Sequence, residues 1–202
     1  TSVHGCIPCA WNSGRIIRER SERYVSQCIE AYAQRNIPVF LTFSNYLITE
    51  ELLCDGPSNR ILEQAARYPG NGVIVASPLL REYIKGRYPD LFQSSSILYV
   101  VNEQKQGDAS FYQALASQFD RVVLHPDDGF NPALLQALSP KNKFEIILNE
   151  NCVRGCAMRK QHCDIVCAYY SSRRESTQFD QLNQFKAKHC KSLQDKHHLR
   201  AY

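Results

Sequence analysis

Short apolar runs recur along the chain, and they are rich in β-branched and aromatic residues. Each run is nearly continuous rather than alternating, which is typical of a strand buried on both faces of a sheet. Polar residues follow each run and mark its end. Residues 1–3 indicate the stub of one more strand. We therefore predict strands at residues 39–43, 73–76, 97–101, 122–124 and 144–148.

Segments with apolar residues at helical spacing lie between these runs. The first carries Tyr24, Val25, Cys28, Ile29 and Tyr32, which share one face of a helix. Asn, Gly and Ser-Pro residues punctuate the ends of such segments. The predicted helices cover residues 22–34, 58–68, 78–88, 110–119 and 132–138.

The alternation of strands and helices predicts an α/β fold with parallel pairing and right-handed crossovers. A repeat of roughly 25 residues favours a (β/α) barrel. Five strands and a stub fall short of eight, so we expect an incomplete or truncated TIM-type barrel. A doubly wound open sheet is the alternative, although no Gly-rich fingerprint follows a strand. We divide the chain into a partial barrel, residues 1–170, and a polar, helical or loosely ordered C-terminal segment, residues 171–202.

Composition adds few constraints to this picture. Hydrophobic residues make up 44% of the chain and charged residues 22%, which fits one globular domain. The formal charge of +4 is too weak to indicate a nucleic-acid partner by itself. No run reaches the roughly 18 apolar residues that a membrane span needs, and no signal peptide is recognisable. The chain starts at Thr1 and not at Met, so we expect an excerpt of a longer protein.

Nine cysteines are many for 202 residues. Their odd number excludes a fully paired disulfide framework, and a domain of this size folds without such bridges. We therefore predict reduced thiols and a cytoplasmic protein. Cys28 and, less strongly, Cys54 fit the pattern of small buried hydrophobic residues.

Polar side chains at the strand ends are the candidate catalytic groups, because the carboxyl ends of parallel strands open into one crevice. The strongest candidates are Asn45, His125, Asn149 and Glu150. Imidazole at a strand end can act as acid, base or ligand. The alternative for each position is a loop opener or a helix cap. We interpret residues 127–129 as a turn.

Four cysteines follow the last predicted strand with the spacing C-x3-C-x6-C-x3-C: Cys152, Cys156, Cys163 and Cys167. Thiolates are the ligands of zinc and of iron–sulfur clusters. On one straight helix the outer two would lie about 22 Å apart, too far for one centre. Either the segment turns near Gly155, or a distant thiol completes the set. Cys190 is the main distant candidate, and the pair Cys6 and Cys9 is another.

Several blocks of the sequence resemble the collagenase-like peptidase family and its uncharacterised bacterial relatives. The blocks are His4-Gly5, the run Trp11-Asn12-Ser13-Gly14-Arg15, Asn45, and the segment 149–162, which reads Asn-Glu-Asn-Cys-x3-Cys-x2-Arg-x2-His. Ala157 stands where relatives tend to have Pro, and Cys163 and Cys167 have no counterpart in the family pattern.

The resemblance implies a (β/α) barrel that carries a four-iron iron–sulfur cluster. It singles out Cys152 and Cys156 as ligands, with two of Cys163, Cys167 and Cys190 completing the set. Arg159 and His162 would then lie at the cofactor. It further implies an enzyme, or an enzyme subunit with a partner subunit, that hydroxylates or otherwise modifies a small aromatic molecule or an RNA base. Two alternatives remain: a binding or scaffolding protein with structural zinc, and a peptidase.

Overall fold

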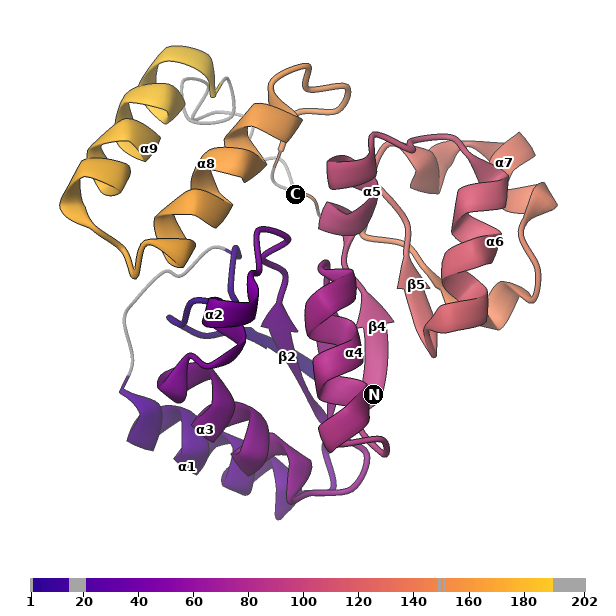
Figure 1. Ribbon diagram of the computed structural model, residues 1–202. Coiled ribbons are helices and arrows are strands. Elements are labelled where there is room, and N and C mark those ends of the chain that lie inside the picture. Colours follow the sequence, from indigo (N-terminus) through magenta and orange to yellow (C-terminus); the bar gives the residue numbers. More distant parts are fainter. Residues whose placement is uncertain (1, 15–20, 149, 151, 191–202) are drawn as a thin grey trace.

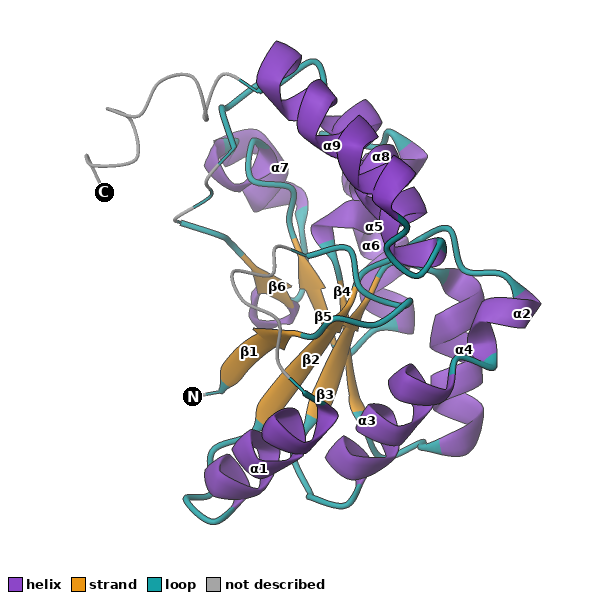
Figure 2. Ribbon diagram, turned by 90° about the vertical axis from the view of Figure 1, so that its left-hand side faces the viewer, coloured by secondary structure: helices purple, strands orange, loops and turns teal. Residues whose placement is uncertain are grey.

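The computed structural model describes residues 2–14, 21–148, 150 and 152–190 (Figure 1). Six parallel strands lie side by side in chain order. Each pairs with the next along the sequence, so β1 and β6 form the two edges of the sheet. The sheet curls into an incomplete barrel (Figure 2). The strands are β1 (Val3–Cys6), β2 (Val39–Phe43), β3 (Gly72–Val75), β4 (Phe92–Ser95), β5 (Arg121–Val123) and β6 (Phe144–Glu145).

Helices connect the strands and cover the outside of the curled sheet. They are α1 (Glu22–Ala33), α2 (Glu50–Leu53), α3 (Gly56–Ala66), α4 (Pro78–Arg87), α5 (Ile97–Glu103), α6 (Ala109–Gln118) and α7 (Pro132–Ala137). All seven begin at a Ser, Thr, Asp or Asn whose side chain accepts a hydrogen bond from a backbone N–H of the first turn. Ser77, at the end of β3, is one of these caps and bonds to the Leu80 N–H. Polar residues after strands therefore start helices here, as capping chemistry predicts.

The core lies between the sheet and these helices. Val73, Val75, Leu80 and Val122 are fully buried, and each such side chain contributes about 1.5–3 kcal/mol through burial. Trp11 is fully buried too, and its indole N–H donates to the Leu52 carbonyl at 2.6 Å. This bond fixes the loop after β1 against the end of α2. The core holds the carboxyl ends of the strands in place, and the site described below is built on those ends.

The segment 97–101 differs from its prediction as a strand, because it forms α5. The true fourth strand is Phe92–Ser95, whose Ser94 and Ser95 gave no apolar signal although both are buried. Ser96 caps the helix, and Tyr99, Val100 and Val101 bury one side of it. Tertiary burial here outweighs the β propensity of Ile and Val.

Two smaller predictions are also wrong. The last strand covers only Phe144–Glu145, and Ile146 and Leu148 beyond it are exposed. Cys54 is exposed and not buried. The remaining strand and helix predictions agree with the structure to within a few residues.

Two further helices follow the sheet. They are α8 (Arg159–Ser171) and α9 (Ser176–His189), which pack against each other and lie above the carboxyl ends of the strands (Figure 1). α8 also packs on α5. The polar C-terminal segment is thus helical as far as His189. The division of the chain at residue 170 stays a prediction.

Among the residues that the structure describes, no helix combines the length and the apolar character needed to cross a membrane.

Candidate functional site

The loop that leads from β6 to α8 carries Cys152 and Cys156 and is tied to the end of β5. Gly155 adopts a left-handed conformation with φ of +64°. Its N–H donates to both carboxylate oxygens of Asp127, at 3.1 and 3.2 Å. The chain therefore turns between Cys152 and α8, as the sequence requires if the four cysteines are to approach one another. The Cys152 N–H donates to Glu150 Oε1 at 2.9 Å, which fixes the start of the turn.

One face of α8 points toward the barrel. Arg159, Cys163, Cys167 and Tyr170 follow each other at helical spacing, and all but Cys163 are buried. Cys167 packs on Tyr46 and Ala76, with Cys163 beside this group. The C-x3-C spacing thus places two thiols one turn apart on the inward face of the helix.

The four thiols form a chain of neighbours from the loop to the helix. The thiol of Cys156 lies close enough to Cys152 to contribute to the raised pKa of Cys152. Cys163 interacts electrostatically with Cys152 on one side and with Cys167 on the other. Burial raises the pKa of Cys152 and of Cys167 to about 11, and that of Cys163 to about 12. A buried thiol with such a pKa stays protonated until a cation replaces the proton.

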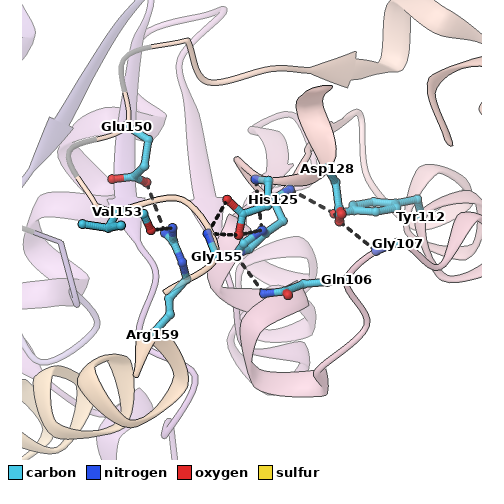
Figure 3. Close-up of polar contacts among 10 residues, drawn as sticks. Gln106, Gly107, Tyr112, His125, Asp128, Glu150, Val153, Gly155 and Arg159 are labelled. Carbon is cyan, nitrogen blue, oxygen red and sulfur yellow. Dashed lines mark hydrogen bonds and ion pairs between the residues drawn. The ribbon is translucent and has the colours of Figure 1, made fainter. Parts of the chain in front are cut away.

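Arg159 brings a positive charge into the same region (Figure 3). Its guanidinium lies 3.5 Å from Glu150 Oε2 and contacts the Val153 carbonyl at 3.5 Å. The arginine side chain is 8% exposed, so its charge is shielded from water. It opposes the rise in pKa of Cys152 and Cys163.

His125 follows β5 and is fully buried. The Asp127 N–H donates to its Nδ1 at 3.3 Å, and the Gln106 side-chain amide lies 3.0 Å from its Nε2. Burial lowers the pKa of His125, and the charge of Arg159 lowers it further. The imidazole is therefore mostly neutral at pH 7.

A buried carboxylate holds the backbone around His125. Asp128 accepts bonds from the Tyr112 hydroxyl at 2.6 Å and from the Gly107 N–H at 3.0 Å (Figure 3). The same hydroxyl accepts a hydrogen bond from the backbone N–H of His125 at 2.9 Å. Burial and the bond to Asp128 raise the pKa of Tyr112, so the phenol keeps its proton. The network fixes the exit of β5.

Asn45, at the end of β2, is fully buried and fully engaged. Its amide donates to the Ala10 carbonyl at 2.7 Å, the Cys167 carbonyl at 3.3 Å and the Ser171 hydroxyl at 3.0 Å. Its oxygen accepts the Leu47 N–H at 2.9 Å. Asn45 thereby anchors α8 to the sheet. Its predicted catalytic role stays a prediction.

A cavity of about 370 Å³ lies on the other side of the cysteine loop, between α8 and α9. Three aromatic rings meet there: Phe185 stacks on His162 at 5.7 Å between centroids and contacts His189 at 5.0 Å. The lining includes Cys152, Cys156 and Cys190. Cys190 is therefore placed on the cavity side, whereas Cys163 and Cys167 face the barrel.

The structure brings together most of the residues singled out in the sequence. Arg159 lies beside Glu150 and interacts electrostatically with Cys152, Cys163 and His125. Asn149 lies outside the described residues. Among the described residues, no group of three or more Cys, His, Asp or Glu side chains is arranged to hold a metal ion.

Sequence reasoning missed the residues that support this region. Asp127 and Asp128 belong to a turn, as predicted, and the second of them starts the short helix η1 (Asp128–Phe130). Their carboxylates, however, hold the cysteine loop and the Tyr112 hydroxyl. The paired acids that follow His125 indicated a polar network in this region. Its other members, Gln106, Tyr112 and Gly155, are distant in sequence.

Comparison with known proteins identifies a shared fold. No protein-family model matches the chain, and no curated protein matches it. A solved structure described as "The Structure of the U32 Peptidase Mk0906" superposes with a TM-score of 0.61. The two are 14% identical, over 86% of this chain and 70% of the other. At this identity the likeness shows the fold alone, an α/β half-barrel.

Proposed function

We propose that this chain binds an iron–sulfur cluster through Cys152, Cys156, Cys163 and Cys167. One observation carries the proposal: the chain turns at Gly155, and Cys152 of the loop interacts electrostatically with Cys163 on the inward face of α8. Four cysteines are the usual ligand set of a four-iron cluster. The likeness to a U32 peptidase, of the collagenase-like family, supports the fold on which such a site would be built.

The donor chemistry of the residues fits a cluster. Cys167 is buried and the other three cysteines are half-buried, and Arg159 supplies a buried positive charge beside Cys152 and Cys163. In a cluster each thiolate binds a separate iron, so the four sulfurs need not crowd one point. Zinc would require sulfurs about 3.8 Å apart, from Zn–S distances of about 2.3 Å in a tetrahedron.

For the reaction, we propose hydroxylation or another modification of a small aromatic molecule or a nucleic-acid base. When bound, the cluster would supply electron transfer. The cavity beyond the cysteine loop supports an aromatic ligand, because aromatic rings line it: Phe185, His162 and His189. His125, buried and neutral, is the group in this region that could accept a proton.

Cysteine-to-serine variants test the ligand set. Each protein is purified without oxygen, loaded with iron and sulfide, and measured by visible absorption and by iron content. Cys163→Ser and Cys167→Ser should each lose most of the bound iron. Cys54→Ser is the matched control, because Cys54 is exposed and far from the group in sequence, and it should keep the wild-type iron content.

Cys190→Ser separates the two competing ligand sets. The proposal expects this variant to retain its iron, since Cys163 and Cys167 complete the ligand set. Cys190 is the competing ligand because it lines the same cavity as Cys152 and Cys156. Iron loss in Cys190→Ser with full retention in Cys163→Ser would overturn the assignment. A colourless protein that holds one zinc per chain would instead support the alternative, a structural zinc site.

A further inference from the structure

Arg159 is a buried cation with too little negative charge around it. It is the first residue of α8, and its side chain is 8% exposed. The nearest carboxylate, that of Glu150, lies 3.5 Å from Nη1, which is longer than a good charge-assisted hydrogen bond. Glu150 itself is 23% exposed and so remains partly hydrated.

The guanidinium also has few hydrogen-bond partners among the described residues. Its Nε is buried and makes no hydrogen bond to any residue that the structure describes. Nη2 reaches the Val153 carbonyl only at 3.5 Å. A buried donor without a partner, on a buried charge, is costly unless an anion compensates for it. This combination therefore indicates that an anion belongs beside Arg159.

The neighbours identify where that anion would be. Arg159 acts electrostatically on Cys152 and Cys163, which come from the loop and from the helix. Four thiolates outweigh the positive charge of an iron–sulfur core, so the ligated cluster is an anion. The N-terminus of α8, with Met158 giving no side-chain cap, points its positive dipole end toward the same region.

We propose that Arg159 is the counter-cation of the cysteine centre, a positioning residue that stabilises the bound cluster and raises its reduction potential. The inference rests on the proposed function, since the anion is the ligated cluster. A nearby positive charge favours the more negative, reduced state. In this role Arg159 neither contacts a reacting atom nor serves as a ligand of the cluster.

Two variants test the inference, each with two readouts. Arg159→Met removes the charge and keeps much of the side-chain volume, whereas Arg159→Lys keeps the charge. In loaded protein, Arg159→Met should shift the midpoint potential downward and release the cluster several-fold faster. Arg159→Lys should stay close to the wild type in potential.

The second readout uses protein without a cluster. There the counter-anion is missing, so Arg159→Met should not lower the urea midpoint of unfolding, and it can raise it. A clear drop in this midpoint would show that Arg159 is a structural ion-pair partner of Glu150, and would overturn the inference.

The inference and the proposed function fail in different ways. A loaded wild-type protein whose potential is unchanged in Arg159→Met overturns the inference alone. A wild-type protein that takes up no iron overturns the proposed function, and the counter-cation role falls with it.

Discussion

The N–H of Gly155 donates to the carboxylate of Asp127 at 3.1 and 3.2 Å, across 28 residues of sequence. Asp127 follows β5 and Gly155 lies between the first two clustered cysteines. This contact therefore fixes the cysteine loop to the carboxyl end of the half-barrel. It explains how cysteines too widely spaced for one straight helix come to lie together.

Gly155→Ala tests the turn that this contact requires. A Cβ at Gly155 would meet no atom within 4 Å, so the cost comes from the left-handed backbone alone. We expect a loss of about 1 kcal/mol in the free energy of unfolding. Gly86→Ala is the control, because Gly86 lies in α4 with equally open surroundings. It should gain about 0.5–1 kcal/mol. Equal effects in urea unfolding would contradict the account.

Asn45→Ala tests the anchor of α8. The change would leave the Ala10 and Cys167 carbonyls and the Leu47 N–H without their side-chain partner. We expect a loss of about 3 kcal/mol by chemical denaturation, since each buried unsatisfied group costs about 1–3 kcal/mol. Asn102→Ala, whose amide donates to the exposed Glu103, should cost less than about 0.5 kcal/mol. A small effect at Asn45 would mean that other contacts hold α8.

The lowered pKa of His125 gives stability a pH dependence with a definite sign. Below about pH 6.5 the unfolded chain binds a proton at this residue while the folded protein does not. The contribution of neutral His125 to the free energy of unfolding is thus fully present above pH 6.5. It falls as the pH drops toward the pKa of His125 in the folded protein, by at most about 1.4 kcal/mol per pH unit. Unfolding of the wild type and of His125→Gln at pH 7.5 and 5.5 measures this. Parallel pH slopes in the two proteins would contradict it.

The buried thiols should react slowly with alkylating reagents in the cluster-free protein. With a pKa of about 12, Cys163 is thiolate in only about one molecule in ten thousand at pH 8. We expect iodoacetamide to label Cys163 at least about 100-fold more slowly than exposed Cys54, by mass spectrometry of digests. Labelling at similar rates would show that α8 exposes its inward face.

Hydrophobic patterning predicts most of this fold because strands buried on both faces and capped helices leave local signals. Val39–Phe43 is both predicted and observed with the same limits. The pattern fails at β4, where Ser94 and Ser95 are buried by neighbouring strands rather than by their own hydrophobicity. It fails again at α5, whose Ile and Val residues favour a strand when tertiary packing is unknown.

In the candidate site, too, some features can be predicted from the sequence and others cannot. Cysteine spacing and the strand-end position of His125 are local, so the sequence reveals them. The bond from Gly155 to Asp127 and the network of Tyr112 with Asp128 join distant segments, and no local pattern predicts them. Asn45 combines both kinds of information: its strand-end position is evident, whereas its four structural hydrogen bonds depend on α8.

The central claim is that this half-barrel carries a cysteine-bound iron–sulfur cluster. Iron and acid-labile sulfide, measured per chain in protein purified without oxygen, test it most directly. We expect about four of each, with a brown colour that fades on exposure to air. Iron and sulfide far below one per chain, in protein that is folded and that has been offered both, would contradict it.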